Sequence, residues 1–259
     1  MYVWTALALG SFCDYDIFEP GDAAGKERRA LVEDTRLWTD GVIPYSFTAE
    51  VDRGLRDRVT EAMRELEGIA DINFVAARGR PAVAERLIIS TRHSEKPAGC
   101  WATVGRYSPA KMNLGWCRDR RHILHELLHV GGMWHEQSRQ DSREFLTMER
   151  SDNINNCLVS RTFSRGMKYD FRSLMHYPLS SLDAELTARG RRRLKEQKTQ
   201  EARVGYYSEL SPLDADNLQA LYGRSTNERT RDAENSNVVA GLIAGGVAVA
   251  VLGMFIALR

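Results

Sequence analysis

The stretch His125–Glu136, with the sequence HELLHVGGMWHE, decides the fold that this chain is expected to adopt. Asp119 can cap a helix over this stretch, and His125 and His129 lie four residues apart, so both imidazoles project from one face. Two imidazoles one helical turn apart form a ready site for a zinc ion. Glu126 lies at the edge of the same face, where its carboxylate can reach a metal-bound water and take its proton.

Two glycines end this helix and allow a third ligand to join the pair. A continued helix would carry His135 out of reach, whereas a turn at Gly131 and Gly132 brings it back as a third imidazole. The pattern H-E-x-x-H alone would occur by chance in about 1% of chains of this size, and the added glycine and histidine make a chance match far rarer. We therefore expect one Zn²⁺ bound by His125, His129 and His135, with the open fourth position that is typical of catalytic zinc.

The composition is that of an ordinary folded domain. The 259 residues are 43% hydrophobic and 27% charged, which excludes a disordered, collagenous or multispanning chain. The net charge of +1 gives no overall field that would attract nucleic acid.

One basic cluster has no interleaved aromatic residues, so no nucleic-acid binding is expected there either. A solvated loop is the default interpretation of this cluster, and a contact with acidic lipid headgroups or acidic substrate residues stays open. Its members are Arg189, Arg191, Arg192, Arg193, Lys195 and Lys198.

Hydrophobic periodicity predicts a compact α+β domain over residues 30–223. Val42–Phe47 has the pattern of a strand, and Asp52–Glu67 that of an amphipathic helix. Strand-like runs follow at Ile72–Ala76 and Leu87–Thr91. This order predicts a mixed sheet packed on helices.

The cysteines indicate in which cellular compartment the chain folds. Of the four, Cys100 and Cys117 flank a segment, 104–112, with the pattern of a hairpin or loop. A disulfide between them is expected only in an oxidising compartment, and two structural cysteines of a reduced protein are the alternative. Cys157 is unpaired if Cys13 is removed with an N-terminal leader, and it is then either buried and inert or part of an intermolecular bridge.

The C-terminal end is apolar. Residues 238–258 include no charged side chain and would form a helix roughly 31 Å long, which matches the hydrocarbon core of a bilayer. The segment is expected to be a transmembrane helix, and a glycolipid-anchor signal also fits. The polar segment 224–237 before it has the composition of a stalk. Gly241 and Gly245 have a spacing that is compatible with helix dimerisation and hence with a homodimer.

The N-terminal end resembles a short signal peptide. Residues 1–12 are apolar and end in small residues, although they lack the usual Lys or Arg. Together with the apolar C-terminal segment, they predict a protein of the secretory pathway, attached to the cell-surface membrane with its catalytic domain outside. Without a cleavable signal, the C-terminal helix could instead anchor a cytosolic protein by its tail.

The chain resembles the astacins, a branch of the metzincin zinc endopeptidases. The long zinc motif followed by Glu136 is typical of that branch, and Ser173–Tyr177 (SLMHY) resembles its Met-turn. Supporting matches are Leu37–Phe47, Gly99–Arg106 and Leu210–Gly223. The resemblance covers nearly all of residues 30–223. It implies a two-lobed, zincin-like catalytic domain with the zinc helix at the floor of a cleft.

The resemblance also assigns roles to residues after the zinc motif. Met175 would lie beneath the metal, and Tyr177 would be a fifth ligand that swings away to stabilise the oxyanion. Family members usually have a second disulfide, but the matching stretches Ala70–Phe74 and Leu221–Glu228 contain no cysteine. The loss of both partners suggests that the whole bridge is absent.

Residues 13–29 are similar to a short family pro-segment. Phe18–Asp22 (FEPGD) resembles the motif in which an aspartate, here Asp22, takes the position of the catalytic water on zinc. Pro20 departs from that motif, and a polar turn around Pro20 and Gly21 is the alternative. A trypsin-like protease would cleave after Arg29 and create a new N-terminus at Ala30. In the family this terminus lies close to the glutamate after the third ligand, here Glu136.

These features together predict a membrane-attached zinc endopeptidase, made as a zymogen, that hydrolyses protein or peptide substrates. The rival hypothesis is a catalytically inactive relative that binds a protein ligand in the same cleft. Loss of Glu126, Tyr177 or a histidine ligand would favour the rival, and all five residues are present.

Overall fold

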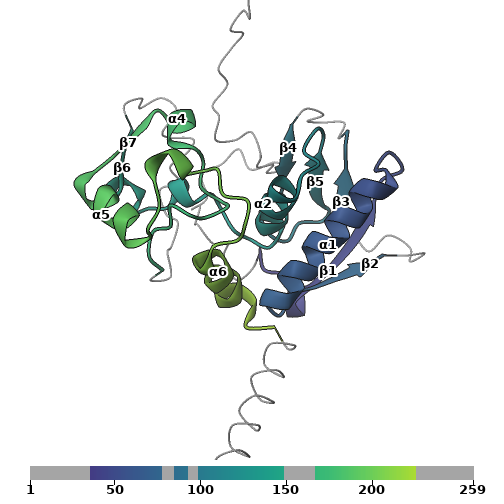
Figure 1. Cartoon of the computed structure of the whole chain (residues 1–259). Helices are drawn as coiled ribbons and strands as arrows, with labels where there is room; N and C mark the ends of the chain where they lie inside the picture. The colour runs from purple at the N-terminus through teal and green to yellow at the C-terminus, as the bar shows by residue number, and fades with distance from the viewer. Residues whose placement is uncertain (1–35, 78–84, 93–98, 149–166, 226–259) are drawn as a thin grey trace, which may run out of the picture.

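The chain forms two lobes, as a computed structural model shows (Figure 1). The structure describes residues 36–77, 85–92, 99–148 and 167–225. The expected signal peptide, the pro-segment with Asp22, and Ala30 lie outside these residues. So do Cys157, the stalk beyond residue 225 and the apolar segment 238–258.

A five-stranded mixed sheet forms the first lobe, which confirms the predicted α+β class. The strand order is β2-β1-β3-β5-β4; β1 runs parallel to β2 and β3, β3 runs parallel to β5, and β4 is antiparallel to β5. The predicted strands lie at β1, β2 and β3, in the expected order. The bounds are β1 Val42–Phe47, β2 Asn73–Ala76, β3 Leu87–Ser90, β4 Cys100–Ala102 and β5 Ala110–Leu114.

Two helices, α1 (Arg53–Ile69) and α2 (Arg120–Val130), pack together beside the sheet (Figure 1). The Asp52 side chain caps α1 by accepting a hydrogen bond of 2.9 Å from the Leu55 N–H. The apolar positions at helical spacing are the ones that α1 buries, as its periodicity predicted. These positions are Leu55, Val59, Met63 and Leu66.

The second lobe has a smaller core of its own. It includes an antiparallel pair, β6 (Leu146–Met148) and β7 (Ala184–Leu186), with α4 (Leu179–Leu182) and α5 (Ala188–Glu196). The expectation of a solvated loop for the basic cluster was wrong over most of its length. Thr187 caps a helix there, because its side chain accepts a hydrogen bond from the Gly190 N–H.

The helix α6 (Pro212–Tyr222) returns the chain to the first lobe (Figure 1). After α6, Arg224 pairs with Ala70 in an isolated antiparallel bridge. The Asp71 N–H donates to the Gly223 carbonyl at 2.9 Å, and the Ser225 N–H donates to the Ile69 carbonyl at 3.3 Å. Backbone hydrogen bonds thus join the two stretches in which the second family disulfide is missing.

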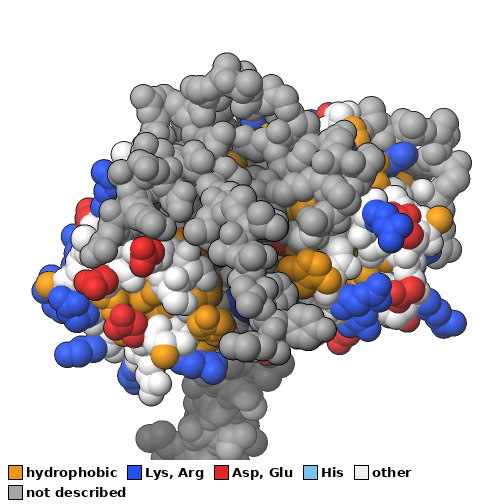
Figure 2. Space-filling view, turned by 90° about the horizontal axis from the view of Figure 1, so that it is seen from above, with side chains coloured by type: hydrophobic (Ala, Val, Ile, Leu, Met, Phe, Trp, Pro, Cys, Tyr) orange, Lys and Arg blue, Asp and Glu red, His pale blue; other side chains and the backbone are white. Residues whose placement is uncertain are grey.

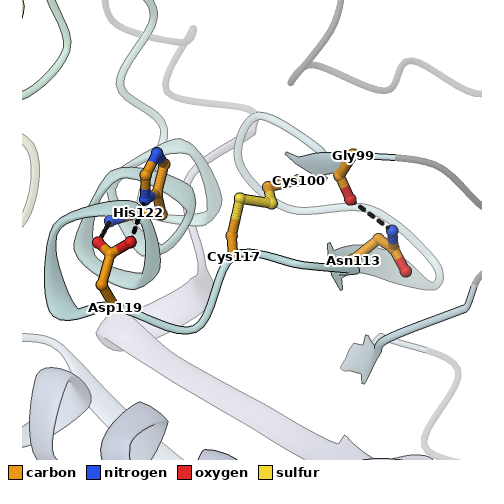
Figure 3. Close-up of a disulfide and its surroundings, with 6 residues drawn as sticks. All are labelled: Gly99, Cys100, Asn113, Cys117, Asp119 and His122. Carbon is orange, nitrogen blue, oxygen red and sulfur yellow. Dashed lines mark hydrogen bonds and ion pairs between the residues drawn. A yellow bond between two sulfur atoms is a disulfide. The ribbon is translucent and has the colours of Figure 1, made fainter. Parts of the chain in front are cut away.

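A disulfide joins Cys100 to Cys117, as predicted (Figure 3). It links the start of β4 to the segment between β5 and α2. The neighbouring Asn113 side chain donates a hydrogen bond of 2.8 Å to the Gly99 carbonyl. Asp119 caps α2, because its carboxylate accepts from the His122 N–H. The bridge therefore fixes the connection that leads into the zinc helix.

Removal of this bridge is expected to destabilise the domain. The cysteines are 17 residues apart, and a loop of that length contributes about 3 kcal/mol through the entropy of the unfolded chain. Replacing both residues by serine should lower the free energy of unfolding by about that amount in guanidinium titrations. Cys157→Ser serves as the control, since it replaces a cysteine outside this bridge and leaves the bridge intact. Equal midpoints for the double variant and the control would contradict the prediction.

None of the helices within the described ranges is both long and apolar enough to cross a bilayer.

Candidate metal centre

Three histidines converge at the end of α2. The Nδ1 atom of His125 lies 2.8 Å from the Leu174 carbonyl, and that of His129 lies 2.7 Å from the Met133 carbonyl. A carbonyl accepts only from a protonated nitrogen, so these contacts select the tautomer in which Nε2 can bind a metal. The ligand atoms of His125, His129 and His135 all lie within 4.8 Å of one another.

These distances fit zinc. Four ligands placed tetrahedrally at the Zn–N bond length lie about 3.4 Å apart, and the Nε2 atoms of His129 and His135 are separated by 3.2 Å. Neutral imidazoles whose second nitrogens are held by carbonyls are the ligand type that Zn²⁺ prefers. The cofactor of this chain is therefore zinc.

The turn after α2 brings His135 to the other two histidines, as predicted. The helix ends at Val130, and Gly132 adopts a φ of 98°, a left-handed conformation that favours glycine. The Met133 N–H then donates to the Leu128 carbonyl at 2.9 Å. His135 is buried, and its ring centroid lies 4.7 Å from that of His129.

The other predicted site residues lie around this centre. Glu126 is buried on α2, beside the first ligand. The ring of Tyr177 is half-buried, with its centroid 4.5 Å from that of His135. Met175 is fully buried in the core of the first lobe.

Asp214 holds the segment that carries Met175. Its carboxylate accepts from the Ser173 hydroxyl at 2.6 Å and from the Leu174 N–H at 2.9 Å. It also completes a capping box with Ser211 at the start of α6. Burial raises the pKa of Asp214 to about 6, and these hydrogen bonds oppose the rise. The capping box is visible in the sequence, but the contact with Ser173 spans 41 residues and no local pattern predicts it.

The backbone of Tyr177 is held on both sides. Its N–H donates to Gln137 Oε1 at 3.0 Å, and its carbonyl lies 2.6 Å from Nδ1 of His176. Burial lowers the pKa of His176 to about 4, so this imidazole is neutral and its Nδ1–H donates to the carbonyl. Its Nε2 can then accept from the Tyr169 hydroxyl, which lies 2.9 Å away.

Glu136 has a charged partner that the sequence analysis missed. The Arg139 guanidinium lies 2.9 Å from Glu136 Oε1, and the Asp170 N–H donates to the same oxygen at 2.7 Å. Burial raises the pKa of Glu136 to about 8, whereas Arg139 acts to lower it. The expected partner, the Ala30 ammonium, lies outside the described residues.

A comparison with protein families decides the classification. The profile of the peptidase family described as Astacin matches residues 30–223. The chain belongs to the astacin family. Its three histidines lie within the matched region, on the helix and turn described above.

Curated relatives of this astacin include much longer proteins. Tolloid-like protein 1 of Homo sapiens is 28% identical over 227 residues, which are 82% of this chain and 21% of that protein. The bone morphogenetic protein 1 homolog of Strongylocentrotus purpuratus is 30% identical over 160 residues, 58% of this chain and 25% of that protein. The astacin chain thus spans about a quarter of the length of these relatives.

A solved structure shares the fold. High choriolytic enzyme 1, a hatching enzyme zinc-protease from Oryzias latipes, aligns with a TM-score of 0.61 and 21% sequence identity. The alignment covers 77% of this chain and 100% of that one. The two-lobed architecture of this chain is therefore an astacin fold.

Loss of the Asp214 carboxylate is expected to loosen the Met-turn of this astacin. Asp214→Ala leaves the N–H groups of Leu174 and Ser211 and the Ser173 hydroxyl without their acceptor in a buried region. A destabilisation of about 3 kcal/mol should follow. Asp216→Ala is the matched control, since Asp216 is an exposed aspartate of the same helix. Equal unfolding midpoints for the two variants in a denaturant titration would contradict this role.

Proposed function

We propose that this astacin is a zinc-dependent endopeptidase that hydrolyses peptide bonds of protein or peptide substrates. The observation that supports it best is the buried Glu126 on the same helix as His125 and His129, whose ligand atoms lie within 4.8 Å of each other and of that of His135. When bound, zinc supplies a Lewis acid that polarises a peptide carbonyl and acidifies a water molecule. His125, His129 and His135 would hold it, and the carbonyl contacts set the tautomers of His125 and His129.

The chain's own side chains supply the proton transfers. The Glu126 carboxylate takes the proton of the attacking water and delivers it to the nitrogen of the departing amine. The Tyr177 hydroxyl donates a hydrogen bond to the oxyanion as the carbonyl becomes tetrahedral. The hydrogen bonds of Gln137 and His176 to the Tyr177 backbone leave only its side chain to move.

Metal analysis and substrate profiling test this function together. Protein that begins at Ala30 should contain one zinc per chain and cleave a random peptide library at internal bonds. Cleavage should stop on dialysis against a chelator and return with zinc. Zinc-loaded, folded protein that cleaves no peptide would favour the rival hypothesis, an inactive relative that binds a protein ligand.

We further propose that the enzyme is made as a zymogen. Asp22 would replace the catalytic water until a trypsin-like protease cuts after Arg29. Both described hydrogen bonds of the Glu136 side chain are made by Oε1, and Oε2 makes none with the described residues, so the Ala30 ammonium would have an acceptor there. Full-length protein should be nearly inactive before cleavage, and Asp22→Ala should raise its activity. Equal activity of the uncut and cut forms would contradict this proposal.

We also propose that the catalytic domain lies outside the cell and is attached to the membrane by residues 238–258. The disulfide supports an oxidising compartment. Surface labelling of intact cells should detect the domain. Release by a phosphatidylinositol-specific phospholipase would indicate a glycolipid anchor, and resistance would indicate a transmembrane helix. Crosslinking would show whether Gly241 and Gly245 support a homodimer. A cytosolic protein with free Cys100 and Cys117 thiols would contradict the proposal.

A further inference from the structure

The second lobe contains a cavity of about 500 Å³ that no zinc ligand lines. This volume lies within the range of ligand-binding pockets. On one side the wall is formed by α5, and on the other by residues around η5 (Ser142–Glu144) and by residues 167–169. The lining residues that matter below are Arg189, Arg192, Arg193, Phe145, Met167 and Lys168.

Three arginines of α5 lie on the face of the helix that lines this cavity. Arg189, Arg192 and Arg193 are spaced i, i+3 and i+4, so they share one face of the helix. The buried face of α5 carries Gly190 and Leu194. A Cβ atom on Gly190 would lie 2.1 Å from the Phe145 carbonyl oxygen, so the helix rests directly on the backbone at Phe145. Close packing of one face thus fixes the direction of the arginine face.

Two of the cations that line the cavity are neutralised by neighbouring carboxylates. Arg189 pairs with Glu144, and Arg193 pairs with Glu196 at 3.1 Å. Arg193 also donates to the Tyr169 carbonyl at 2.7 Å. These arginines therefore contribute little net positive charge to the cavity.

The other two cations are not neutralised. The side chains of Arg192 and Lys168 are exposed and make no hydrogen bond or ion pair with any residue that the structure describes. The remaining acidic group of the lining, Asp141, is occupied by Arg139, with two contacts of 2.9 Å. The cavity therefore carries an uncompensated charge of about two positive units. Figure 2 shows Lys and Arg side chains, interspersed with Asp and Glu, around the same end of the molecule as α5, beside exposed apolar surface.

We propose that this cavity binds an acidic segment of a polypeptide, with Arg192 and Lys168 pairing with Asp or Glu carboxylates. Arginine and lysine bind carboxylates through charge-assisted hydrogen bonds. Phe145 and Met167 supply apolar wall that fits the methylene groups of such side chains. A pocket of mixed apolar and cationic surface suits a peptide better than a uniformly sulfated glycan. The idea that the cavity binds substrates of the enzyme rests on the proposed function. The binding of an acidic peptide does not depend on that function.

One wall residue of the cavity is connected to the segment that carries Tyr177. Tyr169 lines the cavity, and the Tyr169 hydroxyl is hydrogen-bonded to His176, which precedes Tyr177. The wall of the cavity thus shares Tyr169 with the framework that positions the Tyr177 backbone.

Binding is measured on the full chain carrying Glu126→Gln, so that no cleavage interferes. The probe is a fluorescein-labelled peptide of alternating Glu and Ala, compared by anisotropy with the same peptide containing Gln in place of Glu. The acidic peptide should bind and the Gln peptide should not. Arg192→Glu should weaken binding by about tenfold or more, because it replaces an attraction by a repulsion. Arg192→Gln, which keeps a good helix former, should weaken it by a smaller factor.

Lys195→Glu is the matched control, since Lys195 is an exposed cation of α5 that does not line the cavity. It should change the affinity by less than about twofold, because charges outside the pocket are screened by salt. Equal effects of the two charge reversals would show diffuse attraction and overturn the proposal. Binding of a heparin fragment that depends on Arg192, without binding of the acidic peptide, would assign the site to a glycan and also overturn it. Wild-type cleavage of neutral peptides without acidic-peptide binding would overturn this proposal and leave the endopeptidase function standing.

Discussion

Replacing Glu126 by glutamine is expected to leave the zinc content unchanged and to lower kcat by a factor of about 10² to 10⁴. Glutamine keeps the size of the side chain on α2, so the three histidines and their carbonyl contacts should stay in place. The amide cannot accept a proton from the attacking water, because its protonation is far too unfavourable near neutral pH. The variant thus removes the general base and keeps the three metal-binding histidines.

Two measurements check this prediction: zinc per chain by elemental analysis, and turnover of a quenched fluorescent peptide. Glu61→Gln is the control, because Glu61 is an exposed carboxylate on α1. It should keep both the metal and the full rate. Near wild-type turnover by Glu126→Gln would show that another group is the general base. Loss of zinc from that variant would show that Glu126 contributes to metal binding rather than to proton transfer.

The zinc centre was predictable because its information is local. His125 and His129 are set by the helical repeat, and a single left-handed glycine, Gly132, redirects the chain toward His135. The helix α1 follows the same rule, since its hydrophobic positions at helical spacing are the ones that it buries.

The support around the centre was not predictable, because it is made by contacts distant in sequence. Asp170 donates its N–H to Glu136 across 34 residues, and Asp214 accepts from Leu174 across 40. Buried polar groups need partners, but a single sequence does not say which ones they find. Arg139 and Glu136 are only three residues apart, but ion pairs with this spacing are also common on exposed helix surfaces. The spacing alone therefore does not predict that this pair is buried.

The basic cluster was expected to be a loop for a related reason. Five cations within nine residues suggest a solvated segment. Only the Thr187 cap and the spacing of Gly190 and Leu194, which the structure buries, favour a helix there. Tertiary packing against Phe145 stabilises a helix that charge repulsion alone would disfavour.

A new disulfide between positions 70 and 224 is expected to raise the free energy of unfolding by up to about 5 kcal/mol. The hydrogen bonds run from Asp71 to Gly223 and from Ser225 to Ile69, so Ala70 and Arg224 form the non-hydrogen-bonded pair between them. Cα atoms of such a pair lie about 4.5 Å apart, within the range of roughly 4.4 to 6.8 Å that disulfides span. The bridge would close a loop of roughly 150 residues, and the entropy that it removes from the unfolded chain grows with loop length.

The test compares the variant Ala70→Cys/Arg224→Cys with Ala70→Ser/Arg224→Ser, which changes the same positions without a bridge. Guanidinium titrations of the oxidised cysteine variant should show a higher midpoint than the serine variant, and a reductant too mild to open Cys100–Cys117 should remove the difference. Peptide mapping of the unreduced protein identifies the new crosslink. Free thiols at both positions after oxidation would show that Ala70 and Arg224 do not pair. A crosslink that forms without raising the midpoint would show that strain in the folded state offsets the entropic gain, because the two terms oppose each other in any engineered bridge.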